Sequence, residues 1–337
     1  MRNLIILLCS IFCVMQSFAQ NTAGQAAQVP FSSAEDNSNY YVYIGSGGKQ
    51  NKANTEIMYK KMKEIYALFD EAFKNSKGIS GSWRALVDDI SNEGLVKGKL
   101  EITLTAVYRE SNGELNKKGG PQLRFSVLIN GFEPYVIRDK KKASGFTEKN
   151  GQDFIDGHLI YVISEKQQEE SFKGFPLYYT GWNKTPEQSC VIITKPDVPL
   201  FKPITVGEFL ELYKNWIAEY NLQKPNDKYN VSAERIEKFI NTYKSGNNEF
   251  YNEPCITIWD RSEQIPYVRR DTYVDDATMG NPWVTFNPSY INKDATAASV
   301  QFITIEWFIQ DDATISSAFK DFKNNFDFKK LQAMLGK

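Results

Sequence analysis

The chain contains one histidine, His158, and this limits the catalytic chemistry that the sequence can support. A Ser-His-Asp or Cys-His arrangement would have to use that residue, and metal sites built from several histidines are excluded by count. The nearest match to a G-x-S-x-G nucleophile motif, residues 78–82 (GISGS), lacks the closing glycine. His158 begins an apolar, strand-like run, so we interpret it as a structural residue.

Carboxylates are the second group that could do chemistry, because paired carboxylates cleave glycosides and clusters of them bind calcium. Three acidic pairs occur in the chain: Asp88-Asp89, Asp275-Asp276 and Asp311-Asp312. Neighbours on a strand point to opposite faces, so no adjacent pair forms a catalytic dyad by itself. We therefore expect these residues in loops and helix caps.

A glycine-rich run that ends in lysine, residues 45–49 (GSGGK), has some features of a phosphate-binding loop. Its spacing does not fit G-x-x-x-x-G-K-[ST], and Gln50 replaces the hydroxyl that would hold magnesium. We interpret the run as a turn before a helix. The sequence thus predicts no catalytic residue, no metal site and no cofactor.

The candidate for ligand binding is an aromatic cluster in residues 175–183 (FPLYYTGWN). Tyr178, Tyr179 and Trp182 could stack on sugar rings if a loop or a sheet edge exposed them. Aromatic residues in strands more often pack in the core or against a neighbouring strand. We keep the three residues as a candidate ligand platform, with core packing as the alternative.

Two cysteines lie outside the N-terminal apolar segment, Cys190 and Cys255, and each is part of an apolar, strand-like run. In an oxidising compartment they could form a disulfide that closes a loop of about 65 residues. A free cysteine also serves as a small buried apolar residue. The sequence leaves both states open.

The N-terminal residues indicate export. Arg2 precedes an apolar run at residues 4–14, and residues 17–19 (SFA) have the small-x-small pattern that signal peptidase recognises. The run is short for a transmembrane helix, and Phe12 stands before Cys13 where a lipoprotein would need a small residue. We predict a signal peptide at 1–19 and a periplasmic or secreted protein that is not a lipoprotein and has no transmembrane segment.

Charge is almost balanced, with 40 Lys and Arg against 41 Asp and Glu, so composition gives no argument for a nucleic-acid partner. Aromatic residues make up 14% of the chain, which suits a packed core with sheets. Residues 20–38 are small and polar and are expected to form a flexible leader.

Apolar residues at helical spacing predict helices over residues 55–75, 205–220, 232–246, 315–325 and 328–335. We expect Asn54 to cap the first helix and Gly78 to end it. Thr205 and Glu208 have the spacing of a capping box, and Asp327 is a candidate cap for the last helix.

Alternating apolar residues predict strands, which lie at 83–89, 100–108, 123–129, 135–138, 158–164, 177–182, 190–194, 255–259, 267–274, 283–287 and 299–308. Short connections favour antiparallel pairing. The grouping of strands and helices predicts an α+β fold with antiparallel sheets and amphipathic helices packed on one face. We expect two α+β modules, 39–170 and 171–337, with the boundary in a polar run near 165–174.

Two segments carry a resemblance: residues 191–212 (VIITKPDVPLFKPITVGEFLEL) and 286–308 (FNPSYINKDATAASVQFITIEWF). They resemble stretches in an uncharacterised family of exported Bacteroidetes proteins, and the signal peptide ending in Phe-Ala-Gln is similar as well. The resemblance implies an architecture of strand, turn and helix start. It implies no activity.

The sequence therefore favours an exported, non-catalytic protein of the cell envelope or exterior that binds a protein or saccharide partner. The alternative is a carboxylate-dependent hydrolase that acts on glycosides or another envelope polymer. An enzyme should gather ionisable groups with perturbed pKa values in one site. A binding protein should instead present an exposed surface.

Overall fold

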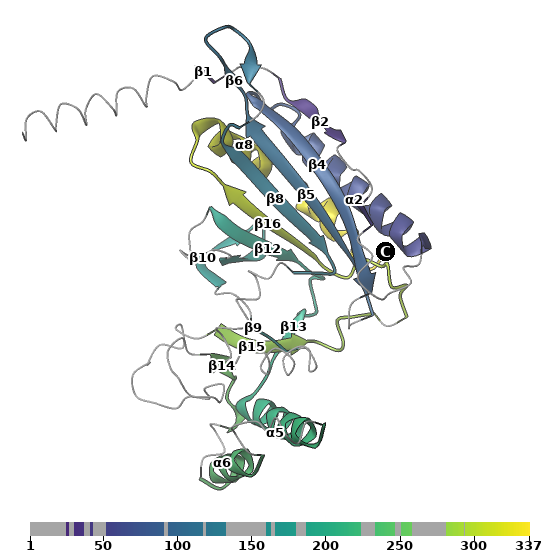
Figure 1. Cartoon of the computed structure of the whole chain (residues 1–337), viewed down its shortest axis with the longest axis vertical. Coiled ribbons are helices and arrows are strands. Elements are labelled where there is room, and N and C mark those ends of the chain that lie inside the picture. Colours follow the sequence, from purple (N-terminus) through teal and green to yellow (C-terminus); the bar gives the residue numbers. More distant parts are fainter. Residues whose placement is uncertain are drawn as a thin grey trace, which may run out of the picture.

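The computed structural model describes residues 25–26, 30–36, 41–42, 52–90, 94–116, 119–132, 160–162, 166–179, 187–223, 233–246, 251–257, 281–292 and 294–337. Over these ranges the chain forms helices and mainly antiparallel sheets (Figure 1). The expected α+β class is therefore confirmed. None of the described helices combines the length and the apolar character that a membrane crossing requires.

A nine-stranded sheet is the largest part of the fold. Its strands are, in spatial order, β10 (Lys166–Phe172), β11 (Phe175–Tyr179), β12 (Gln188–Ile193), β16 (Ile303–Ile309), β8 (Gln122–Ile129), β5 (Val96–Ala106), β4 (Ile79–Ile90) and β2 (Ser32–Asp36), with β3 (Tyr41–Val42) also paired to β4. Neighbours are antiparallel except β2 and β3, which run parallel to β4. Buried and half-buried residues alternate along β5, as its sequence predicts.

Three helices pack on one face of this sheet: α2 (Lys52–Phe73), α8 (Ala313–Asn325) and α9 (Phe328–Gln332). The predicted apolar stripe of α2 is buried, and its members are Met58, Met62, Ile65, Phe69 and Phe73. Asp312 caps α8 by accepting from the backbone N–H groups of Thr314 and Ile315. Asp327 caps α9 in the same way from Lys330, as the sequence predicts.

Phe322 of α8 lies at the centre of the core that joins these helices to the sheet. Its ring centroid is 4.6 to 6.4 Å from seven other rings, those of Phe69, Phe73, Phe125, Phe172, Phe319, Phe326 and Phe328. These rings come from α2, β8, β10 and the two C-terminal helices. One side chain therefore links the C-terminal helices to three segments that are far from them in the sequence, α2, β8 and β10.

A smaller sheet lies with the remaining helices, in the lower part of Figure 1. Its strands are β13 (Phe201–Pro203), β15 (Asn281–Phe286), β14 (Ile256–Thr257) and β9 (Ile160–Val162). The helices are α5 (Val206–Gln223) and α6 (Ala233–Gly246). Phe209 of α5 packs against Trp283 of β15 with ring centroids 5.3 Å apart, which fixes α5 to this sheet.

The N-terminal part of the fold differs from expectation. Part of the expected leader pairs with the body of the protein: β1 (Gln25–Ala26) pairs with β6 (Tyr108–Arg109), and β2 extends the large sheet. A further short strand, β7 (Leu115–Asn116), pairs with β6. A strand at a sheet edge needs only its backbone to pair, so small polar residues do not prevent it.

The polar run near residue 170, where we expect the boundary between two modules, forms a strand. Residue 170 lies inside β10, which forms a hairpin with β11. Strands β12 and β16 then continue the sheet that β4, β5 and β8 form, through the pairing of β16 with β8. Charged residues are common both in linkers and in edge strands, so the polar composition of this run does not distinguish the two.

The ends of α2 are a smaller correction. The helix already includes Lys52, so Asn54 lies inside it and is not its N-cap. Gly78 has φ +73° but lies beyond the helix end, at the start of β4. The strands expected at 135–138 and 267–274 lie outside the described residues.

We predict that Phe322→Ala lowers the free energy of unfolding by about 3–5 kcal/mol, because it leaves a cavity that seven rings line. Phe319→Ala is the matched control, since Phe319 lies on the same helix but is only half-buried. It should cost less than half as much. Equilibrium denaturation with a constant slope measures both, and equal losses would contradict the central role of Phe322.

Candidate functional site

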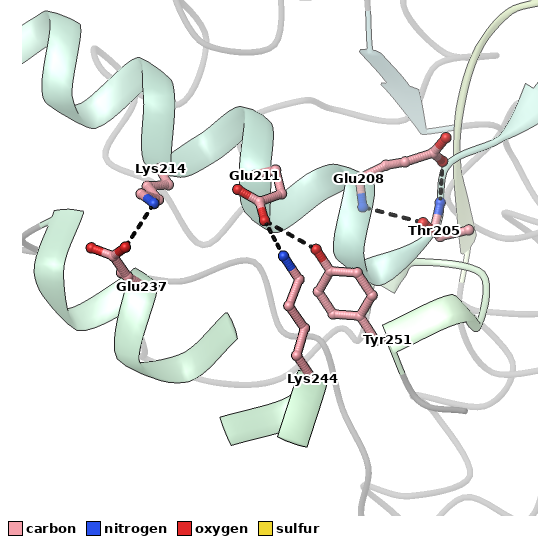
Figure 2. Close-up of polar contacts among 7 residues, drawn as sticks. All are labelled: Thr205, Glu208, Glu211, Lys214, Glu237, Lys244 and Tyr251. Atoms are coloured by element: carbon pink, nitrogen blue, oxygen red, sulfur yellow. Dashed lines mark hydrogen bonds and ion pairs between the residues drawn. The ribbon is translucent and has the colours of Figure 1, made fainter. Parts of the chain in front are cut away.

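Two groups of polar side chains in the described residues could carry a function. The first, which we call the Glu211 cluster, joins α5 to α6 and consists of Glu211, Lys214, Glu237, Lys244 and Tyr251 (Figure 2). The second lies on the face of the large sheet that no described helix covers.

The capping box that begins α5 positions the Glu211 cluster. The Glu208 N–H donates to the Thr205 hydroxyl at 3.1 Å, and the Thr205 N–H donates to the Glu208 carboxylate at 2.9 Å (Figure 2). The predicted capping box is thereby confirmed. The backbone hydrogen bond from Thr205 lowers the pKa of Glu208. Partial burial raises this pKa, but the hydrogen bond and charge of Lys202 lower it further, and the net pKa is lowered.

Glu211 lies one turn further along α5 and holds two partners. Lys244 of α6 donates to its Oε1 at 2.7 Å, and the Tyr251 hydroxyl donates to the same oxygen at 3.2 Å. Lys214 and Glu237 form a second bridge between the helices at 3.2 Å (Figure 2). These contacts fix the angle between the two helices.

Gly207 makes room for the tyrosine of this cluster. A Cβ at position 207 would stand 2.1 to 2.5 Å from three atoms of the Tyr251 ring, closer than any real contact. The ring therefore lies directly over the first turn of α5. This close approach explains a glycine inside a helix, where it otherwise costs up to about 1 kcal/mol relative to alanine.

The pKa shifts in the Glu211 cluster describe an ion-pair lock and not an acid–base site. The hydrogen bond from Lys244 lowers the pKa of Glu211, and the same bond raises the pKa of Lys244. Burial raises the pKa of Tyr251. Each shift moves a pKa away from neutrality, so all three groups keep their ordinary protonation state near pH 7. A general acid or base would instead need to exchange a proton at that pH.

The open sheet face is the second group. It consists of outward-facing residues of β4, β5, β8 and β16, opposite the helices: Ser82, Arg84, Lys99, Glu101, Thr103, Arg124, Ser126, Glu306 and Phe308. Register places Arg84, Glu101, Ser126 and Glu306 in one row across four strands. The next row runs through Ser82, Thr103, Arg124 and Phe308.

Glu101 organises the charges on this face. It accepts from Arg84 Nε on one side and from Lys99 Nζ at 2.9 Å on the other. Burial raises the pKa of Glu101, but the hydrogen bonds from Arg84 and Lys99 outweigh it and the net pKa is lowered. The carboxylate thus stays ionised and holds both cations in place.

Two arginines on the open sheet face share one arrangement. The Nε–H group of Arg84 donates a hydrogen bond to the Glu101 carboxylate, while the Arg84 side chain remains 62% exposed. Arg124 is also exposed, and its Nε–H group donates a hydrogen bond to the side-chain oxygen of Gln122 at 2.7 Å. A guanidinium has five N–H donors, so each arginine is oriented through Nε and keeps its terminal nitrogens for other acceptors.

Phe308 adds an apolar element beside Arg124. Phe308 is half-buried and belongs to neither of the two described core clusters. The other apolar residues of β16 pack into the core under the helices. Cross-strand pairing puts it opposite Arg124 and Gln188. An aromatic ring between polar side chains is suited to contact with a partner.

The aromatic cluster predicted from the sequence is only partly described. Tyr178 is half-buried and packs against the core cluster of Cys190, Ile192, Leu200, Tyr290 and Phe302, and burial raises its pKa to about 12. Tyr179 ends β11, and Trp182 lies outside the described residues. Tyr178 thus packs as a core residue, which is the alternative that the sequence left open.

The cysteines are not bridged. Cys190 and Cys255 are both buried free thiols, and burial raises the pKa of each thiol. Cys190 lies in β12 of the large sheet, whereas Cys255 precedes β14 of the smaller sheet. The disulfide considered from the sequence is therefore absent, and the two residues serve as small apolar core residues.

The other residues considered for chemistry are placed as follows. His158, the pair Asp275-Asp276 and the run 45–49 lie outside the described residues. Asp312 caps α8 and accepts from the Tyr108 hydroxyl at 2.6 Å, and Asp88 is exposed. In the described part of the chain, no group of three or more His, Cys, Asp or Glu could hold a metal ion.

The sequence did not predict the open sheet face, because its rows join strands that lie far apart in the chain. Arg84 and Arg124, for example, share a face only through the pairing of β5 with both of their strands. The available signal was weak: alternating polar residues in the predicted strands 83–89, 100–108 and 123–129 indicate one solvated face but not its register.

We predict that Thr205→Ala destabilises the protein by about 1 kcal/mol, because it removes the hydroxyl that caps α5. Thr205→Ser keeps the hydroxyl and should be nearly neutral. Equilibrium unfolding of the three proteins measures both effects. If the alanine variant and the wild type unfold together, the cap does not contribute.

The contribution of Glu208 should depend on pH. Its pKa in the folded protein is below its ordinary value of 4.5, so its stabilising contribution is present above pH 4.5 and is lost as pH falls through the lowered pKa. Glu208→Gln should therefore be less stable than the wild type at pH 7 and equal to it well below pH 4.5. A gap that persists unchanged in acid would contradict the role of the carboxylate.

We predict that Gly207→Ala costs about 1–3 kcal/mol through the overlap with Tyr251. In a Tyr251→Ala background the overlap is gone, and the same change should stabilise by up to about 1 kcal/mol, because alanine is the better helix former. A double-mutant cycle measures this reversal. Equal effects of Gly207→Ala in the two backgrounds would show that the ring does not occupy this space.

Comparison of the chain with protein-family models, with curated proteins and with solved structures gave no match in any of the three. The resemblance of residues 191–212 and 286–308 to exported Bacteroidetes proteins remains an expectation. The two polar groups described above are therefore the features from which a function can be inferred.

Proposed function

We propose that the protein is an exported, non-catalytic binding protein of the cell envelope or its exterior, and that it holds its partner on the open sheet face. The observation that carries this proposal is the pair of arginines, Arg84 and Arg124, each oriented through Nε and open to solvent at its terminal nitrogens. Side chains that are fixed before binding lose less entropy when the partner arrives.

The chemistry of the partner follows from these two guanidinium groups. A planar guanidinium binds a carboxylate through two parallel hydrogen bonds, which a lysine cannot do. Arg84 and Arg124 are separated by one strand and two residues of register, so their backbones lie about 12 Å apart by ordinary strand spacing. The partner would carry carboxylates at a matching distance, either on a protein or on an acidic saccharide.

The pKa pattern supports binding over the alternative of a carboxylate-dependent hydrolase. Such an enzyme needs a carboxylic acid whose pKa is raised toward neutrality so that it can donate a proton. Among the described carboxylates with a resolved shift, Glu101, Glu208 and Glu211, the pKa is lowered in every case. These groups are permanent anions that hold cations.

We predict that carboxylate polymers bind to the protein and that binding depends on the two arginines. Polyglutamate and polygalacturonate are suitable probes, because they present the same group on a peptide and on a saccharide. Arg84→Gln/Arg124→Gln should weaken binding at least about tenfold at low salt, since each lost pair of charged hydrogen bonds is worth about 1.5–3 kcal/mol. Titration calorimetry measures the affinities.

Two further variants make the test specific. Lys60→Gln/Lys329→Gln removes two exposed charges from helices on the opposite side of the sheet and should leave affinity nearly unchanged. Arg84→Lys/Arg124→Lys keeps the charge but loses the planar geometry and should be intermediate. Equal losses for the helix variant and the arginine variant would mean that only net charge matters, and the proposed face would be wrong.

A further inference from the structure

The outer edge of β4 is covered by the N-terminal segment of the chain. One edge of this 12-residue strand pairs with β5. On the other edge, β2 pairs at Ser32↔Ser80, Glu35↔Ser82 and Asp36↔Trp83, and β3 pairs at Tyr41↔Leu86 and Val42↔Val87. The pairing is parallel and its register shifts between Ser32 and Glu35, so this ladder is weaker than the antiparallel ladders of the same sheet.

A single aromatic residue anchors the start of this segment. The Phe31 N–H donates to the Ser76 carbonyl at 3.0 Å, and its ring centroid lies 6.1 Å from that of Phe73 at the end of α2. Pro30 forms an isolated bridge with Lys77. A backbone ladder combined with an anchoring side chain is the way in which proteins bind extended peptides at a sheet edge.

The opposite edge of the sheet is protected by different means. Strand β10 has the sequence KQQEESF, and its register shifts between Lys166 and Ser171. Charged residues and irregularities of this kind discourage pairing with another chain. Residues 79–87 of β4 (ISGSWRALV) contain one charge. Without the N-terminal segment, this long edge would be open to another strand.

We infer that the outer edge of β4, together with the end of α2, is a strand-acceptor site, and that a second copy of the chain supplies its ligand. The ligand consists of residues 30–36, which include β2, and of β3 at residues 41–42, with Phe31 as the anchor. When a copy receives this segment from a neighbouring copy, it makes the same contacts that it otherwise makes with its own N-terminal segment. Two copies that exchange segments form a closed, two-fold symmetric dimer.

The balance between the two states depends on concentration. A segment on its own chain competes at an effective concentration of the order of 1 mM, as for a short tether. Exchange should therefore involve roughly a tenth of the copies at about 100 µM, and about a hundredfold fewer at 1 µM. The dimer then becomes significant where the protein is locally concentrated.

Cysteine trapping of the full chain tests the inference. Residues paired across adjacent strands have Cα atoms close enough for a disulfide, so Ser32→Cys/Ser80→Cys should oxidise to a bridge. Cys9 and Cys13 are changed to serine in every variant, and the native Cys190 and Cys255 are buried and do not compete. On a non-reducing gel, an internal bridge gives a monomer and an exchanged segment gives a covalent dimer. The dimer fraction should rise at least tenfold between 1 and 100 µM.

Two controls separate segment exchange from other association. Ser32→Cys/Ser126→Cys places the second cysteine on β8, two strands away from β4, and should give no dimer by this route. Adding Phe31→Ala to the trapping pair should lower both bridges several-fold, because the anchor is lost. A dimer that survives Phe31→Ala unchanged would reveal a different interface and overturn the inference.

The remaining outcomes are also decisive. An internal bridge with no dimer at 100 µM would overturn exchange between copies, and the absence of any bridge would overturn the acceptor register itself. If the cysteine variants do not fold, two full-length versions with different tags can be mixed at 100 µM and examined by native mass spectrometry. Hybrid dimers that Phe31→Ala abolishes would then support the inference, and hybrid dimers that survive this change, or the absence of hybrid dimers, would overturn it.

Discussion

The packing around Phe322 is the constraint on which the rest of the structure depends. Because its ring contacts residues of α2, β8, β10 and the C-terminal helices, these helices must all pack on the face of the large sheet that Phe125 of β8 and Phe172 of β10 line. Burial on that face uses every second residue of the central strands β5 and β8. The other residues are left on the opposite face, so the position of the aromatic core determines that the polar rows of the open sheet face exist.

Local signals in the sequence predicted the parts of the fold that depend on neighbours three or four residues apart. The capping box of Thr205 and Glu208, the cap at Asp327 and the apolar stripe of α2 are of this kind. The pairing of β16 with β8 joins residues 303–309 to residues 123–129, and no local pattern specifies such a partner. The row of Arg84, Glu101 and Ser126 depends on pairings of that kind, which is why the candidate site could not be predicted.

The two edges of the large sheet show why polar composition predicts an edge strand poorly. A central strand must bury side chains on at least one face, so its sequence alternates or is apolar throughout. An edge strand such as β2 or β10 needs only backbone partners and is often charged, as the sequence KQQEESF shows. Polar composition therefore distinguishes a core strand from a loop, but it does not distinguish an edge strand from a loop.

Glu101 and Glu211 show how the same ion-pair chemistry leads to different roles. Both carboxylates bind two donors and both have a lowered pKa. Glu211 takes its partners from α6 and from Tyr251, so its contacts hold together elements of one chain. Glu101 holds Arg84 through Nε alone, and the guanidinium remains largely exposed. The first set of contacts stabilises the fold, whereas the second leaves guanidinium donors exposed, where a carboxylate of a partner can replace the water that solvates them.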